Sequence, residues 1–252
     1  MSSKIPILNE RELGQMREAC RKTARVLHKV AAAVTPGVTT GELDALARKF
    51  TKEEGGKASF LGYNGYPGAI CISINDEVIH GIPGKRVVLP GDVVSLDFGV
   101  WYEGFTGDSA VTVMVGVTDP QVIKLVETTR RALEVGISMV KPGAHLSDVS
   151  HAIQSVAEGD GFSVVREFTG HGVGRHLHEE PSIPNYGAPG RGPVLKPGMV
   201  LAIEPMVNMG RAAIRILDDD WTVVTRDGQP AAHFEHSVAV VEGGAEILTL
   251  AN

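Results

Sequence analysis

The sequence predicts an α+β protein whose single domain consists of two related halves. Three observations support this prediction. Amphipathic helical segments alternate with short β-branched strands, turns rich in Gly and Pro separate them, and three segments of the first half recur in order in the second. The chain has 252 residues, of which 43% are hydrophobic and 21% charged, so it is long enough to bury a substantial core.

Four helices are predicted from capping signals and apolar spacing. Residues 9–34 carry apolar side chains at helical spacing, and Asn9 is followed three residues later by Glu, the pattern of a capping box. The break "VTPGVTTGELDALARKF" ends this helix and begins a second near residue 39 or 40. Asp119 and Pro120 open a third helix that runs to about residue 140, because they suit the N-cap and the first helical position. The break "VKPGAHLSDVSHAIQSVAEGDG" begins the fourth.

The two breaks are alike and mark an internal repeat. Segments of the first half align without gaps on segments of the second: 34–47 on 140–153, 89–97 on 196–204, and 108–116 on 235–243. The two halves span roughly residues 10–116 and 119–250. We expect them to pack about a pseudo-two-fold axis within one domain of residues 1–252. Because only about eight residues precede the first helix, we expect no N-terminal extension.

Composition and charge argue against several classes of protein. The net charge of -6 disfavours broad binding to nucleic acid or anionic membranes. The longest apolar runs are far shorter than a membrane span, and "MSSKIPILNERE" lacks the apolar core of a signal peptide. Cys20 and Cys71 form no CxxC pair, so both are interpreted as reduced thiols. We therefore expect a cytoplasmic monomer with no nucleic-acid specificity and no membrane association.

Four carboxylates are superposed by the repeat. Asp97 falls on Glu204 and Asp108 falls on Glu235, all in alternating segments typical of sheet strands. A single strand carboxylate is usually solvated, but four that converge about a pseudo-two-fold axis repel one another unless cations lie between them. Two metal ions roughly 3.5–4 Å apart, bridged by carboxylates, would resolve this repulsion. Arg or Lys could neutralise the group instead, but neither type recurs beside these positions.

A histidine in "TGHGVG" completes the predicted ligand set. A carboxylate-only cluster favours Mg or Ca, whereas a neutral imidazole favours a transition metal. The glycines that flank His171 let backbone and side chain approach a crowded centre. The predicted ligands of two divalent ions (Co, Mn, Fe or Zn) are therefore Asp97, Asp108, His171, Glu204 and Glu235. His233 and His236, on either side of the last ligand, are interpreted as structural, with His236 pointing away from it.

Together these residues resemble the metal-binding motifs of type I methionine aminopeptidases. The resemblance covers essentially the whole chain and rests on "DFG", "GDSA", "GHGVGRHLHEEP", "LKPGMVLAIEPM", "FEHSVAV", "GYNGYPGAICISINDEVIHGIP" and "DDWTVVTRDG". It implies the pita-bread fold, a curved antiparallel sheet flanked by helices. It also implies a metalloaminopeptidase that removes the N-terminal methionine from nascent proteins with a small second residue, by attack of a metal-bridged hydroxide on the scissile carbonyl.

The resemblance also implies roles for individual residues. It implies that Asp97 chelates one metal, that His171 and Glu204 hold the other, and that Asp108 and Glu235 bridge the two. It also implies that Glu204 transfers the proton and that His178 hydrogen-bonds the developing oxyanion. His80 would contact the substrate near the scissile amide. The implied methionine pocket is lined by Phe60, Tyr63, Tyr66, Cys71, Leu177 and Trp221. Phe60 stands where bacterial relatives tend to carry a small residue, and Leu177 where an aromatic is usual. We interpret the pair as a compensating swap that refills the same space.

Two other functions remain open at this point. One is a proline-directed aminopeptidase or prolidase of the same fold, although such enzymes usually carry an additional N-terminal domain. The other is a non-catalytic peptide-binding module, which would be expected to lose ligands, and none is missing here. The expected partners are nascent polypeptide N-termini, and docking on the ribosome surface is left open.

Overall fold

The helices begin where the capping signals predict. In the computed structural model, which describes residues 4–251, α1 (Glu10–Ala31) starts at an Asn9 capping box and α3 (Pro120–Ser138) starts after an Asp119 N-cap. The remaining helices, α2 (Thr40–Glu53) and α4 (Leu146–Gly159), follow the two breaks. Both α1 and α3 end a few residues earlier than predicted, because the chain leaves each helix through a tight turn before it reaches the proline of the break.

The strands within the described residues form three antiparallel sheets. The main sheet has the order β1-β4-β5-β14-β9-β7-β8, with β2 also paired to β4 and β15 to β14. The small sheets are β13-β10-β6 and β11-β12-β3. Strand bounds are β1 Lys57–Ala58, β2 Cys71–Ile74, β3 Glu77–Ile79, β4 Val93–Tyr102, β5 Phe105–Met114, β6 Ser163–Val164, β7 Gly170–Gly172, β8 Glu179–Ile183, β9 Val200–Ile203, β10 Met206–Asn208, β11 Ile214–Ile216, β12 Val223–Thr225, β13 Ala231–His233, β14 Glu235–Val241 and β15 Gly244–Ile247. A 3-10 turn, η1, covers Tyr63–Gly65.

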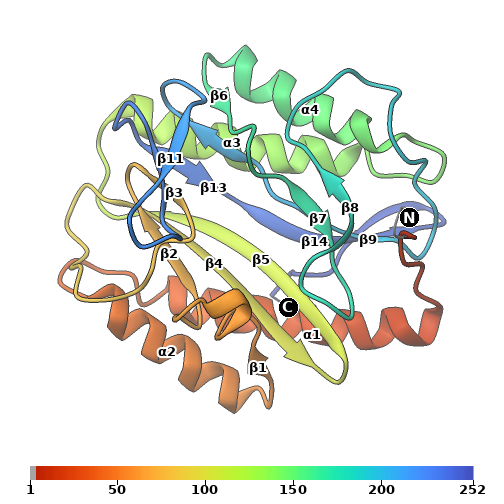
Figure 1. Cartoon of the computed structure of the whole chain (residues 1–252), viewed down its shortest axis with the longest axis horizontal. Coiled ribbons are helices and arrows are strands. Elements are labelled where there is room, and N and C mark those ends of the chain that lie inside the picture. Colours follow the sequence, from red (N-terminus) through yellow and green to blue (C-terminus); the bar gives the residue numbers. More distant parts are fainter. Residues whose placement is uncertain (1–3, 252) are drawn as a thin grey trace.

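Each pair of helices has its own core against the main sheet. In Figure 1, α1 and α2 lie below the long β4–β5 hairpin, and α3 and α4 lie above it. One buried apolar cluster joins α1 and α2 to β2 and β4, with Phe98 at its centre among the largest buried side chains. Another joins α3 and α4 to β9, β10 and β14. The predicted α+β class, with a curved antiparallel sheet flanked by helices, is confirmed.

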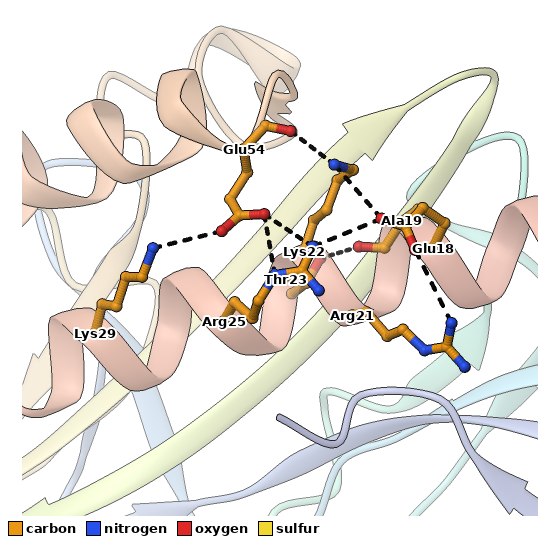
Figure 2. Close-up of polar contacts among 8 residues, drawn as sticks. All are labelled: Glu18, Ala19, Arg21, Lys22, Thr23, Arg25, Lys29 and Glu54. Atoms are coloured by element: carbon orange, nitrogen blue, oxygen red, sulfur yellow. Dashed lines mark hydrogen bonds and ion pairs between the residues drawn. The ribbon is translucent and has the colours of Figure 1, made fainter. Parts of the chain in front are cut away.

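The first two helices are tied together by ion pairs at the C-terminal end of α2, as Figure 2 shows. The guanidinium of Arg25 contacts Glu54 Oε2 through Nη2 at 2.8 Å, and Lys29 Nζ lies 3.4 Å from Oε1 of the same residue. Lys22 Nζ donates to the backbone carbonyl of Glu54 at 2.8 Å. Arg25 and Glu54 are partly buried, so their ion pair orients α1 against α2 more effectively than an exposed pair would.

One close approach of α1 to β5 bears directly on the site. A Cβ on Gly107 would lie 2.6 Å from the Cα of Cys20, so only glycine allows the helix to come this near. The Thr23 hydroxyl accepts from the amide of Val100 at 3.2 Å and lies 3.1 Å from the carbonyl of Gly107. These contacts hold the backbone next to Asp108, one of the predicted ligands.

The predicted duplication stays a prediction, although the two halves show parallel local features. Thr39, in the first break, forms an isolated bridge with Val87, and His145, in the second, forms one with Val194. Among the described residues, no helix is both long and apolar enough to cross a membrane.

Candidate metal centre and adjoining pocket

Strand register brings three of the five predicted ligands to one face of the sheet. Asp97 on β4 lies opposite Ala110 on β5, and Ala110 lies opposite Glu235 on β14. Directly opposed residues of antiparallel strands point to the same face, so Asp97 and Glu235 share it. Asp108 is two residues from Ala110 and therefore lies on that face as well. The small side chain of Ala110 leaves room between the carboxylates.

The second half delivers the other two ligands by the same geometry. Ala202 on β9 lies opposite both His171 on β7 and Ser237 on β14. Glu204 is two residues beyond Ala202 and therefore continues that face. A Cβ on Gly170 would lie 2.5 Å from the carbonyl oxygen of Ala202, which explains a glycine beside His171.

The ligand atoms approach one another closely. Asp108, His171 and Glu235 each offer one atom such that all of these atoms lie within 4.8 Å of one another. Nε2 of His171 is 3.8 Å from Asp108 Oδ2 and 3.4 Å from Glu204 Oε1. Asp97 is not in the three-residue group, but it faces the same space from the neighbouring strand.

Several carboxylate oxygens at this centre have no protein donor among the described residues. Oδ1 of Asp97, Oδ1 of Asp108 and Oε1 of Glu235 are buried and have no hydrogen-bond partner among the described residues. Burial raises the pKa of Asp97 to about 7 and that of Glu204 to about 8. Burial and the neighbouring carboxylates raise the pKa of Asp108 and Glu235 well above their usual values. Orphaned carboxylate oxygens that face one another fit a bound cation.

His171 is prepared to act as a neutral ligand. Its Nδ1 lies 2.9 Å from the carbonyl oxygen of Gly172, and a carbonyl can only accept, so Nδ1 carries the proton. The lone pair of Nε2 then faces Asp108 and Glu204. Burial lowers the pKa of His171 to about 3, which keeps the imidazole neutral. This arrangement favours a transition metal over Mg or Ca.

A cavity of about 370 Å³ opens directly onto this centre. It is lined by all the residues that the sequence assigned to the site: Phe60, Tyr63, Tyr66, Cys71, His80, Asp97, Asp108, His171, Leu177, His178, Glu204, Trp221 and Glu235. Phe60, Tyr66, Cys71 and Leu177 form one buried apolar cluster, against which Tyr63 and Trp221 pack. The predicted ligands therefore line one side of the cavity, and this apolar cluster lines another, which we call the apolar wall.

Phe60 and Leu177 lie in the same cluster, and both are buried. Both belong to the apolar wall of the cavity, and the interpretation of the pair as a compensating swap stays a prediction. The Tyr66 hydroxyl donates to the carbonyl of Gly81 at 2.8 Å, which leaves its ring to form the wall. Trp221 packs edge-on against that ring, with centroids 5.0 Å apart.

Two histidines stand beside the ligands without belonging to them. Tyr63 Oη lies 2.7 Å from Nδ1 of His178, and the His178 ring is 4.3 Å from that of His171 between centroids. His80 packs edge-on against Phe168 with centroids 5.6 Å apart, and burial lowers its pKa to about 4. Its φ of 61° is unusual for a residue other than glycine, and such backbone often marks a functional position.

Several residues of the site were not identified from the sequence. The cavity is also lined by Asn64, Ile79, Phe168 and Thr169. His233, interpreted as structural, instead places Nε2 3.4 Å from Glu204 Oε2. Only two positions separate it from Glu235, but His233 ends β13 and Glu235 begins β14, so the spacing within one strand did not predict this contact. His236 hydrogen-bonds the hydroxyl of Thr249 at 2.8 Å, as expected for a residue that points away.

Comparisons with known proteins show the family of this chain. The model of metallopeptidase family M24 matches residues 14–242. Methionine aminopeptidase 1 of Bacillus subtilis is 53% identical over 239 residues, covering 95% of this chain and 96% of the relative. Methionine aminopeptidase 1 of Mycobacterium tuberculosis is 47% identical over 98% of this chain and 95% of that protein.

Solved structures of two kinds of enzyme share the fold of this chain. The methionine aminopeptidase of Thermotoga maritima superposes with a TM-score of 0.96 at 48% identity, covering 98% of this chain and 99% of that one. The prolidase of Pyrococcus furiosus shares the fold at 22% identity and a TM-score of 0.79, and the match covers 98% of this chain and 66% of the prolidase. The fold is thus the pita-bread fold, and the chain belongs to metallopeptidase family M24 and, within it, to the methionine aminopeptidases.

Proposed function

We propose that the chain hydrolyses the N-terminal methionine from polypeptides whose second residue is small. The observation that carries this proposal is the cavity, in which an apolar wall adjoins five ligand-type side chains on one sheet face. Relatives named methionine aminopeptidase at about half identity over nearly the whole chain support the same activity.

The metal would be held by Asp97, Asp108, His171, Glu204 and Glu235, as two divalent ions of Co, Mn, Fe or Zn. The orphaned carboxylate oxygens and the free Nε2 of His171 support this assignment. Bound there, the metal supplies Lewis-acid polarisation of the scissile carbonyl and a nucleophile at neutral pH.

The protein's own groups then move protons and hold the substrate. Glu204 takes the proton of the attacking water and passes it to the leaving amine. When the Tyr63 hydroxyl donates to Nδ1 of His178, the proton of the neutral ring lies on Nε2, which can donate to the carbonyl oxygen as negative charge develops. His80, on the cavity wall, contacts the substrate near the scissile amide.

The methionine side chain would occupy the apolar wall of the cavity. Aromatic rings at Tyr66 and Trp221 suit a thioether, because sulfur makes favourable contacts with ring edges. Phe60 and Leu177 close the far side and limit the length of the side chain that fits. Leu177 immediately precedes His178, so the pocket wall and the oxyanion donor come from one segment.

A comparison of substrates tests this function. Purified protein is loaded separately with Mn, Fe, Co or Zn and assayed on Met-Ala-Ser and on Xaa-Pro peptides. We expect turnover of Met-Ala-Ser and little of Xaa-Pro. Preference for Xaa-Pro would instead support the prolidase alternative, and binding of peptide without cleavage would support the non-catalytic one. Metal analysis of native protein identifies the ion and its stoichiometry.

The cellular setting follows from this activity. We propose that its substrates are nascent polypeptide N-termini, that it acts in the cytoplasm as a monomer, and that docking on the ribosome surface is open to test. The net charge of -6 supports the absence of nucleic-acid specificity. Sedimentation with translating ribosomes, compared at low and high salt, tests the docking.

A further inference from the structure

His233 is a buried imidazole for which the roles above leave no function. Its side chain is about 1% exposed, and Nε2 has no hydrogen-bond partner among the described residues. A buried nitrogen of this kind costs free energy unless it meets a partner in the working state. Two carboxyl groups interact with this imidazole: Asp97, and Glu204, whose Oε2 lies 3.4 Å from Nε2.

The backbone of His233 is held firmly in place. Its amide donates to Thr112 Oγ1 at 3.0 Å, and the Thr112 hydroxyl donates to its carbonyl at 2.6 Å. Ser95 Oγ, which lies 2.9 Å from Thr112 Oγ1, supports the same threonine from β4. Thus β13, which belongs to a small sheet, is anchored to the β4–β5 hairpin that carries Asp97 and Asp108.

Glu204 lies between two imidazoles. Oε1 is 3.4 Å from Nε2 of His171, whereas Oε2 is 3.4 Å from Nε2 of His233. Its backbone carbonyl accepts from Asn185 Nδ2 at 2.9 Å, which fixes the main chain but leaves the carboxylate free to rotate. The two imidazoles therefore distinguish the two oxygens of one carboxylate.

We propose that His233 is a positioning residue, whose Nε2–H donates to Oε2 of Glu204 and turns Oε1 toward His171 and the metal. A small rotation of either side chain brings the 3.4 Å contact into good hydrogen-bond geometry. Hydrogen-bond partners of ligating carboxylates orient them, and their loss typically weakens metal affinity or activity by about 10–100-fold. This inference rests on the proposed role of Glu204 as metal ligand and proton shuttle.

The test compares His233→Leu, which removes the donor, with His233→Gln, which keeps an N–H donor on a chain of similar reach. The matched control is His236→Leu, because His236 lies on β14 and hydrogen-bonds the hydroxyl of Thr249 outside the cavity. Three quantities are measured for each variant: the melting temperature of the chelated apoprotein, the dissociation constant of Mn²⁺ or Co²⁺ by titration of the apoprotein, and kcat and KM on Met-Ala-Ser.

We expect His233→Leu to weaken metal binding by about 10–100-fold and to lower kcat more than it changes KM. The Gln variant should stay within about threefold of the unmodified protein, and the apoprotein melting temperatures of the Leu and Gln variants should agree. Unchanged metal affinity in the Leu variant overturns the proposal. Equal losses in the Leu and Gln variants also overturn it, because they indicate packing or direct ligation.

The same series separates this inference from the function on which it depends. If the unmodified protein binds no divalent metal and does not cleave Met-Ala-Ser, the proposed function fails. If the unmodified protein binds metal and cleaves Met-Ala-Ser, and His233→Leu has the same metal affinity and kcat, only the role of His233 fails.

Discussion

The metal-ligand face and the methionine pocket lie side by side but are built differently. The five ligands come from consecutive strands of one sheet, so the register of β4, β5, β14, β9 and β7 places them together. The pocket wall combines Cys71 on β2, directly opposite Asp97, with connecting segments that include η1, the chain before His178, and the turn that contains Trp221. Backbone hydrogen bonds between strands position the ligand side chains, whereas side-chain packing positions most residues of the pocket wall. Substitutions in the two regions should therefore have different consequences.

The largest expected effect is on the ligand face. Glu204→Gln removes a ligand charge and the proton shuttle together, so kcat on Met-Ala-Ser should fall by roughly 10²–10⁴-fold at saturating metal. Glu167→Gln, an exposed carboxylate outside the cavity, is the control and should leave the rate unchanged. A near-normal rate for Glu204→Gln would refute the role assigned to Glu204.

Removal of metal should make the free energy of unfolding depend on pH through the carboxylates of the ligand face. In the folded apoprotein the pKa of Asp97 is about 7 and that of Glu204 about 8, raised by burial from usual values of 3.8 and 4.5. At pH values between the usual and the raised pKa of each carboxyl, the folded state binds more protons than the unfolded chain. The free energy of unfolding therefore falls as pH rises.

The melting temperature of chelated protein should therefore decrease from about pH 5 to about pH 8, by roughly 2–4 °C for each kcal/mol lost. Metal-loaded protein should not show this decrease, because the cation replaces the protons. Scanning calorimetry of both forms measures the difference, and parallel curves would show that no cation compensates these carboxylates.

An intermediate effect is expected at the boundary of the two regions. His178→Ala should lower kcat by about 10-fold or more, as loss of an oxyanion donor does, while the dissociation constant of the metal stays the same. Steady-state kinetics and metal titration are measured on one preparation. Loss of metal affinity in parallel with the rate would make His178 a ligand instead.

In the pocket wall, Phe60→Leu should change the ratio of kcat/KM between substrates more than it changes kcat. Loss of ring area in an apolar pocket lowers kcat/KM for methionine by about tenfold, and bulkier side chains gain relative to methionine. Competition between Met-Ala-Ser and Phe-Ala-Ser, whose first side chain is bulkier, gives the ratio, with metal affinity as the control. A uniform loss of kcat on both substrates would contradict a role confined to the wall.

The smallest effect should come from Tyr63→Phe. The variant keeps the ring and removes only the hydroxyl that lies 2.7 Å from Nδ1 of His178. Loss of one neutral hydrogen bond corresponds to about 1 kcal/mol, or roughly fivefold in kcat. In the double variant with His178→Ala, the Tyr63 substitution should have no further effect, and additive losses would show that the two residues act independently.

The local elements of this protein follow from sequence alone. Asn9, Thr39 and Asp119 mark three helix starts because capping is a local interaction of side chain and backbone. The predicted ligands are recognisable for a related reason, since a carboxylate in an otherwise apolar strand is conspicuous and the alignment of the two halves pairs four of them.

Tertiary structure decided what depends on distant neighbours. The sequence placed His233 near Glu235 but could not show that its imidazole meets Glu204, because β13 lies in a separate sheet whose docking is set by Thr112. Phe168 and Ile79 likewise join the pocket only through packing. Periodicity assigns a side chain to a face of its own strand, whereas the partner it meets across that face depends on how separate elements pack, which no local pattern encodes.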